Sequence, residues 1–353
     1  MQLTCNTQPL AAHETHRELN SAEFCTPTWH NLHETDHTPA PPVGYMGLWQ
    51  TDDHSAISTR CSRLIIDYAH ECSTNPDWNA ERSLDIKRTS GIDRKNQLWI
   101  FNRSHPEFHT FLKDGPTFKY DFFAVDAVWR KQQGIQCVAT TPLLERPLKG
   151  LLMTAQIQSK PWRKTMLRTL FRSGLHNHLL LTTLQQTPFK DKDPKFVEWC
   201  IAHGKPLDGV KQWQDDREGY GRGWPCDHTL YERTRYSIVF ETYGCGGEFL
   251  GSKYIDNFPT EKTYRAILMG HPFILVAEPG LHSHLESLGF EMYHNPIESP
   301  KQLTHTVAKW QGMSRKAWKQ FVLRAEHNQR VLDEFGNREL GKLQRKLEEW
   351  TRI

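Results

Sequence analysis

The sequence predicts an α/β protein made of two Rossmann-like domains, each with a parallel sheet. Its 353 residues are enough for two domains of ordinary size. Short apolar segments alternate with segments of helical periodicity. Residues 150–182 and 236–276 both have the order strand, helix, strand, which is typical of a βαβ unit and therefore of parallel strands.

The composition is that of a folded protein. Hydrophobic residues make up 37% of the chain and charged residues 24%, which permits a proper core. No apolar run approaches the roughly 20 residues that cross a bilayer, and the N-terminus lacks a signal-peptide pattern. The eight cysteines form no Cys-x-x-Cys pair, which disfavours structural zinc and a disulfide framework. We expect a cytoplasmic protein.

The first 58 residues show little periodicity, and the PAPP segment at 39–42 predicts a stiff turn. Two groups there have the spacing of a possible cation site: His30, His33 and His37, and Asp52, Asp53 and His54. No cysteine or carboxylate pattern completes a tetrahedral set around either group. We therefore expect polar surface here and no metal site.

Three strands are expected in the first domain, at 64–68, 97–101 and 119–125, with a helix around 79–90. Acidic residues lie near the ends of these strands: Asp67 and Glu71 around the first turn, and Asp126 after the third strand. Such acids are candidates for proton transfer, but an acid near a strand end also commonly caps a helix or pairs with arginine.

Residues 129–149 are basic and rich in turn residues, so the domain boundary is placed there. The expected limits are 1–147 for the N-terminal domain, 148–312 for the C-terminal domain and 313–353 for C-terminal helices. The second domain is expected to begin with a strand at 150–156. No Gly-x-Gly-x-x-Gly follows this strand, which disfavours a dinucleotide-binding dehydrogenase.

An amphipathic helix is expected next, and Gly174 should end it before a strand at 178–182. Its apolar face would consist of Met166, Leu167, Leu170 and Phe171. Its cations are Lys160, Arg163, Lys164, Arg168 and Arg172. A run of this kind is usually a solvated helix face, which is the role expected of Arg172.

Residues 190–235 predict a short helix ended by Gly204, followed by a polar, Gly-rich loop. At the C-terminal end of the chain, helices are expected at 302–311 and 315–335, with Ser314 capping the second. A separate amphipathic segment is expected after Gly336.

The second βαβ unit contains the most informative residues. The strand 236–240 ends on Glu241, and after a Gly-rich loop Thr260 is a good N-cap for a helix beginning at Glu261. The strand 272–277 follows. Glu241, Glu261 and Lys262 should therefore lie at the carboxyl edge of the sheet, where ligands bind in this class of fold.

The start of this helix suits a phosphate group, because helix N-termini carry partial positive charge. The positive charge of Lys262 in the first turn is repelled by this partial positive charge, and a nearby anion would remove the conflict. Glu261 has the chemistry to accept hydrogen bonds from ribose hydroxyls. The alternative is that Glu261 is a favourable first-turn acid and Lys262 is solvated.

The motifs Phe240-Glu241-Thr242, Thr260-Glu261-Lys262 and Gly270-His271-Pro272 resemble the nucleotide-sugar site of the α-1,3-fucosyltransferases and their relatives. The family has Asn where Thr242 stands. The same block also resembles glycosyltransferase-like proteins of bacteriophages. The ordered match covers roughly a third of the chain.

The resemblance implies the GT-B architecture, in which two Rossmann-like domains face a cleft and a C-terminal helix crosses back onto the N-terminal domain. It implies a nucleoside diphosphate sugar as co-substrate, with no cofactor and no metal. The donor-binding residues would be Arg163, Glu241, Thr260, Glu261 and Lys262. Glu71 fits best as the general base, with Asp67 second, and the transfer would be inverting if it follows the family.

The resemblance to phage proteins implies a hydroxymethylated pyrimidine in DNA as acceptor, in the host cytoplasm. Basic stretches at 129–149, 158–172 and 310–330 would then contact DNA. A glycan or lipid-linked sugar is the alternative acceptor. A non-catalytic Rossmann protein that binds nucleotides or DNA is the alternative from another class.

Overall fold

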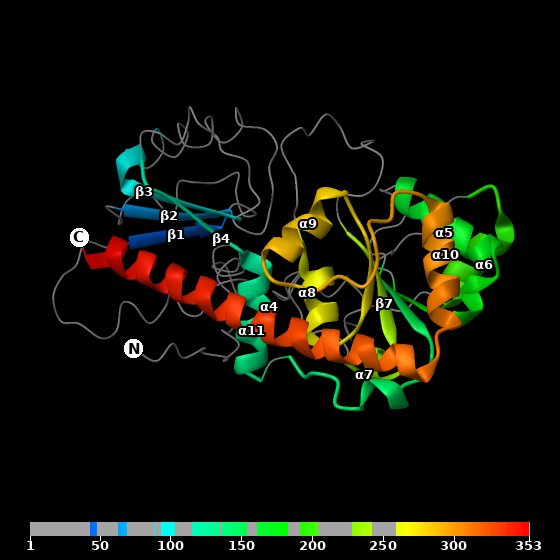
Figure 1. Cartoon of the computed structure of the whole chain (residues 1–353). Helices are drawn as coiled ribbons and strands as arrows, with labels where there is room; N and C mark the ends of the chain where they lie inside the picture. Colours follow the sequence, from blue (N-terminus) through cyan, green and yellow to red (C-terminus); the bar gives the residue numbers. More distant parts are fainter. Residues whose placement is uncertain are drawn as a thin grey trace, which may run out of the picture. The chain divides into compact units, whose positions relative to one another are not determined.

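A computed structural model describes the residues 43–47, 63–68, 88, 93–102, 115–134, 136–153, 161–182, 191–203, 228–241 and 259–352. Figure 1 shows their helices and strands. Internal contacts divide the chain into two compact units. Unit 1 contains the described residues up to Phe122 and those from Arg338 onward. Unit 2 contains the described residues from Phe123 to Asn337.

Unit 1 holds a four-stranded parallel sheet with the strand order β1-β2-β3-β4. Its strands are β1 (Val43–Gly47), β2 (Arg63–Tyr68), β3 (Gln97–Asn102) and β4 (Thr117–Tyr120), and a 3-10 turn, η3 (Arg94–Asn96), precedes β3. The side chains of β3 from Leu98 to Phe101 are fully buried, as expected of a strand covered on both faces. β1 was not predicted from the sequence.

The strand predicted at 119–125 is wrong beyond Tyr120. The chain turns at Asp121 and enters helix α4 (Phe122–Gln132). Asp121 interrupts the apolar run, and from Phe122 onward buried residues recur with helical spacing, at Phe122, Val125 and Val128. The helix predicted around 79–90 lies outside the described residues except for Arg88, which is helical.

Unit 2 holds a second four-stranded parallel sheet, with the order β6-β5-β7-β8. Its strands are β5 (Gly150–Met153), β6 (Leu179–Thr182), β7 (Tyr236–Phe240) and β8 (Phe273–Val276). Every residue of β7 and β8 is buried. Both predicted βαβ units and the α/β class with parallel sheets are confirmed.

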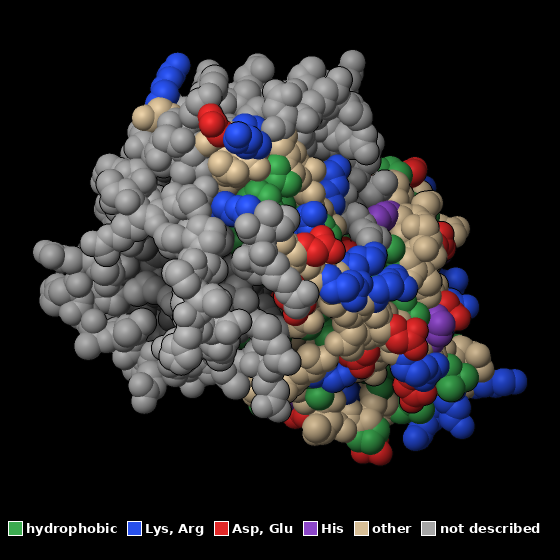
Figure 2. All heavy atoms as spheres, turned by 90° about the vertical axis from the view of Figure 1, so that its left-hand side faces the viewer, with side chains coloured by type: hydrophobic (Ala, Val, Ile, Leu, Met, Phe, Trp, Pro, Cys, Tyr) green, Lys and Arg blue, Asp and Glu red, His purple; other side chains and the backbone are tan. Residues whose placement is uncertain are grey.

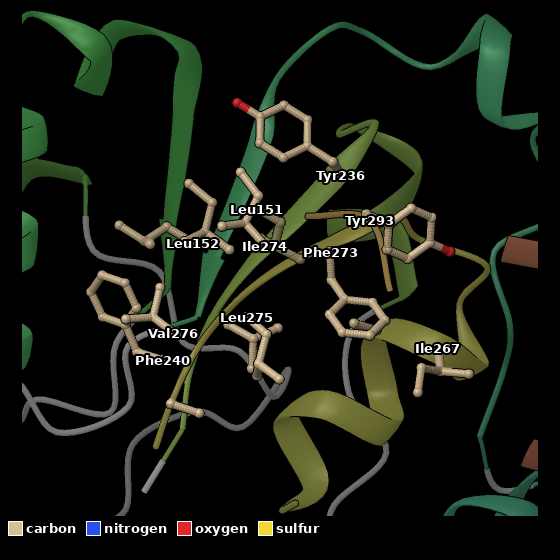
Figure 3. Close-up of a cluster of buried hydrophobic side chains, with 14 of the residues drawn as sticks. Leu151, Leu152, Tyr236, Phe240, Ile267, Phe273, Ile274, Leu275, Val276 and Tyr293 are labelled. Atoms are coloured by element: carbon tan, nitrogen blue, oxygen red, sulfur yellow. The ribbon is translucent and has the colours of Figure 1, made fainter. Parts of the chain in front are cut away.

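The remaining elements of unit 2 are helices and two 3-10 turns. They are η5 (Leu143–Glu145), α5 (Pro161–Arg172), η6 (Leu175–His178), α6 (Pro194–His203), α7 (His228–Glu232), α8 (Glu261–Leu268), α9 (Gly280–Ser287) and α10 (Pro300–Gln311). Figure 3 shows buried side chains of the unit 2 sheet, where Leu152, Phe240 and Val276 lie close together. Ile267 of α8 belongs to the same hydrophobic core. A core of this kind holds the strand ends in fixed positions.

Helix α11 (Arg315–Arg352) is one continuous helix of 38 residues. The break predicted at Gly336 is therefore wrong. A Cβ at Gly336 would lie 2.5 Å from Val128 Cγ2 and 2.9 Å from the Ala124 carbonyl oxygen, so glycine is needed where α11 passes α4.

The end of α11 from Arg338 onward belongs to unit 1. There the Asp121 N–H donates to the Glu339 carboxylate at 3.3 Å, and the Arg63 guanidinium donates to the Trp350 carbonyl at 2.8 Å. The GT-B arrangement and the domain limits at 147/148 and 312/313 remain predictions.

The described surface in Figure 2 carries basic and acidic side chains next to one another. Within the described ranges, no helix has both the length and the apolar character needed to cross a membrane.

Candidate functional site

The sheet of unit 2 reverses its direction of growth between β5 and β7. The chain leaves β5 through α5 and adds β6 on one side, then leaves β7 through α8 and adds β8 on the other. Met153 at the end of β5 pairs with Val239 near the end of β7. In open parallel sheets, ligands bind outside the strand ends at such a switch point. The predicted donor-binding residues all lie beside it.

Glu241 follows β7 directly and its side chain is fully buried. Its carboxylate accepts hydrogen bonds from the Thr260 N–H at 3.0 Å, the Thr260 hydroxyl at 2.5 Å and the Thr263 hydroxyl at 2.5 Å. The anion at the start of α8 is therefore the protein's own carboxylate, which meets the need of the helix N-terminus for negative charge.

Lys262 lies in the first turn of α8 and is 3% exposed. Its Nζ donates to Thr260 Oγ1 at 2.6 Å and to Glu261 Oε1 at 3.1 Å, and lies 3.7 Å from Glu241 Oε2. The conflict expected between this cation and the helix N-terminus is thus offset by two carboxylates. Thr260 caps α8 as predicted, since its side chain accepts from the Lys262 N–H.

Arg163 lies in the first turn of α5 and is 2% exposed. Its guanidinium donates through Nε, at 3.1 Å, and through Nη2 to the Glu241 carbonyl oxygen. Burial lowers the pKa of Arg163 to about 10, although Glu241 and Glu261 act in the opposite direction. Arg163 and Lys262 come from different crossover connections, and both contact Glu241.

These residues are called the Glu241 cluster below: Arg163, Glu241, Thr260, Glu261, Lys262 and Thr263. Glu261 is the member most open to solvent, with 29% of its side chain exposed. Burial would raise the pKa of Glu261, but the charges of Lys262 and Arg265 outweigh it and lower the pKa to about 2. Glu261 is therefore an ionised hydrogen-bond acceptor at neutral pH.

The other cations of α5 have different partners. Arg168 forms an ion pair with the buried carboxylate of Asp191, and Lys164 Nζ lies 3.5 Å from the same group. Arg172 is largely exposed, and its Nε lies 3.6 Å from Asp193. The surface role expected of Arg172 agrees with this position. Lys160 lies outside the described residues.

Both candidate bases belong to unit 1. Glu71 and the two histidine-containing candidate cation sites lie outside the described residues. The backbone of Asp67 is paired within β2, next to Ile100 of β3, one residue before the strand ends. The described residues contain no group of three or more His, Cys, Asp or Glu side chains that suits a metal ion.

Asp126 does not follow a strand, contrary to the prediction. It lies within α4, where its carboxylate is 2.7 Å from Arg130 Nε. Burial raises the pKa of Asp126, and the charge of Arg130 opposes that rise. An i,i+4 ion pair within a helix is a sufficient structural role for this acid.

Sequence reasoning missed Thr263 and Asp191. Thr263 lies one helical turn after Thr260, so its place on the same side of α8 was available from the helical period. Nothing in the sequence pairs Asp191 with Arg168, 23 residues earlier. That contact depends on how the chain after β6 returns to α5.

Comparison with known proteins adds little to this geometry. No protein-family model matches the chain, and no curated protein matches it. A search of solved structures finds a chain of the "Glycosylation Associate Protein (Gap123) complex from Streptococcus agalactiae", with a TM-score of 0.41 and 12% identity. The match covers 88% of this chain and 55% of that one, so this chain spans about half its length. A similarity this low carries no conclusion about function.

Proposed function

We propose that this protein is a glycosyltransferase that binds a nucleoside diphosphate sugar at the carboxyl edge of the unit 2 sheet. The observation that supports this proposal is that Arg163 and Lys262 both contact Glu241 at the switch point. The two cations would bind the diphosphate, and the ionised Glu261 would accept hydrogen bonds from the ribose. Binding requires the diphosphate to replace the contacts of Lys262 with Thr260 and Glu261.

In the proposed reaction, an acceptor hydroxyl attacks the anomeric carbon of the sugar as the bond to the diphosphate breaks. A carboxylate takes the hydroxyl proton, and Glu71 is proposed for this role, with Asp67 second. The two cations stabilise the negative charge that develops on the leaving diphosphate, so the proposed reaction needs no divalent metal.

The acceptor we propose is a hydroxymethylated pyrimidine in phage DNA, which rests on the sequence resemblance alone. A glycan or lipid-linked sugar is the alternative. One observation favours a non-catalytic nucleotide- or DNA-binding protein: the Glu241 carboxylate already accepts three hydrogen bonds from α8, as a purely structural group would.

The test is a panel of nucleoside diphosphate sugars, scored by thermal stabilisation and donor hydrolysis. Hydroxymethylated DNA is then added and examined for a mass gain of one sugar. Lys262→Gln should abolish donor stabilisation, whereas Lys309→Gln, an exposed lysine of α10, should not. Glu71→Gln should bind the donor without turnover.

Failure of every donor to stabilise the wild-type protein would refute the proposal. Stabilisation by a nucleotide together with turnover that does not depend on Glu71 would reject that residue as the base. Nucleotide binding with no turnover on any acceptor would favour the non-catalytic alternative.

A further inference from the structure

Arg235 joins two segments at the amino edge of the unit 2 sheet. Its N–H donates to the Lys149 carbonyl at 2.9 Å, just before β5 begins. Its guanidinium donates to the carbonyls of Arg146, at 3.0 Å through Nε, and Leu144, at 3.2 Å. The loop before β5 and the turn before β7 are therefore held side by side.

The start of α11 lies at the same place. The Arg235 guanidinium carbon is 5.7 Å from the ring centroid of Trp318. Burial lowers the pKa of Arg235, and the nearby charge of Arg315 lowers it further. Positive charge from three distant chain segments is thus gathered here: 145–149, 232–235 and 315–319.

The cations of these segments that reach the surface are called the amino-edge patch: Lys149, Arg233, Arg235, Arg315, Lys316 and Lys319. Within the described part of the chain, none of the six forms an ion pair. The three segments hold seven Lys and Arg against two Glu, whereas the whole chain has a formal net charge of only +3. The patch is therefore a local concentration of positive charge.

The three basic stretches expected from the sequence differ in the partners of their cations. In 129–149, Arg130 and Lys131 pair with Asp126 and Asp333. In 158–172, the described cations pair with acids near 191–193 or join the Glu241 cluster. Among the exposed cations of these stretches, Lys149, Arg315, Lys316 and Lys319 form no ion pair with a described residue.

We propose that the amino-edge patch binds the phosphate backbone of a nucleic-acid duplex. Phosphate recognition depends on exposed Lys and Arg and needs no apolar surface. Stable protein interfaces usually also bury apolar anchors, and interfacial membrane helices insert an apolar face. The exposed large apolar side chains of the described chain, Ile201 and Leu323, lie outside the three segments.

The patch is an anchor, separate from the candidate donor site. It lies at the amino ends of β5 and β7, which have four and five residues, whereas the Glu241 cluster lies at their carboxyl ends. At about 3.3 Å per residue, the two edges are roughly 15 Å apart. Backbone binding here is independent of base sequence and does not rest on the proposed sugar transfer.

The test measures binding of the full-length protein to a fluorescent 30-base-pair duplex of ordinary bases, by anisotropy at several salt concentrations. Lys149→Gln, Arg315→Gln and Lys319→Gln are combined in one variant. The matched control combines Lys192→Gln, Lys195→Gln and Arg330→Gln, exposed positions with the same charge change. Thermal unfolding of both variants checks that they fold.

The patch variant should bind at least about tenfold more weakly than the control, and its slope of log affinity against log salt should fall by about 3. Equal weakening by the two variants would overturn the proposal. The proposal would also be overturned if the wild-type protein does not bind the duplex, including the case in which it binds anionic vesicles or an acidic polypeptide instead. The single variant Arg315→Gln replaces the triple variant if that does not fold, and should lower the slope by about 1.

Discussion

Glu241 shows how one residue can determine a local structure at the end of a strand. Its carboxylate is buried and neutralised by Lys262, and it also caps the start of α8. A buried charge is tolerated only when it is paired and hydrogen-bonded, as this one is. The position of Arg163 depends on the same residue, through the Glu241 carbonyl.

Replacement of Glu241 by glutamine should destabilise the protein by about 2–4 kcal/mol, because Lys262 would remain buried without its full countercharge. The free energy of unfolding in urea measures this. Glu286→Gln, at an exposed position of α9, should change the same quantity by less than about 0.5 kcal/mol. Equal effects of the two changes would show that Glu241 carries no structural role.

The ionisation of Glu261 should be visible in stability against pH. Its pKa falls from an ordinary 4.5 to about 2 in the folded protein, because Lys262 and Arg265 outweigh the effect of burial. A lowered pKa contributes stability that is present above 4.5 and is lost as pH falls towards 2. The stability difference between wild type and Glu261→Gln should therefore shrink from about pH 5 to about pH 3. A difference that stays constant with pH would contradict this assignment.

At the scale of elements, α11 and α4 approach each other closely at Gly336. Gly336→Ala should destabilise the protein by about 1–3 kcal/mol, despite the better helix propensity of alanine, because the new methyl group meets Val128 and the Ala124 carbonyl. Gly341→Ala in the same helix is the control. Its Cβ would meet only the end of the Arg345 side chain, at 3.5 Å, so it should stabilise by up to about 1 kcal/mol. Unfolding curves of the two variants should shift in opposite directions.

The elements that were predicted well are those in which the local sequence pattern of apolar and capping residues matches the residues that are buried in the structure. The strand at 236–240 and the helix start at Glu261 were predicted to the residue, because an apolar run and an N-cap threonine mark them. The end of β4 and the continuity of α11 were missed because neighbours in space decide them. The bonds within the Glu241 cluster are likewise tertiary, although Glu241, Glu261 and Lys262 were expected at one edge of the sheet.

At the scale of the whole molecule, unit 1 depends on the part of α11 from Arg338 onward. Leu343 and Trp350 of α11 are buried there, and the Asp121 N–H is bonded to Glu339. The unit that holds the first sheet therefore depends on residues more than 200 positions later in the sequence. The second sheet lies in unit 2, which ends at Asn337.

Deletion of residues 338–353 should therefore affect the two sheets unequally. Amide hydrogen exchange in β2 and β3 should accelerate at least about tenfold, since the deletion removes the partner of Arg63 and exposes apolar surface. Exchange in β7 and β8 should change little, because their neighbours are retained. Mass spectrometry of peptides from both sheets measures the contrast, and the variant Leu343→Ala should show the same order with a smaller effect. Equal acceleration in both sheets would mean that the two units unfold together, and that the end of α11 stabilises the protein as a single cooperative structure.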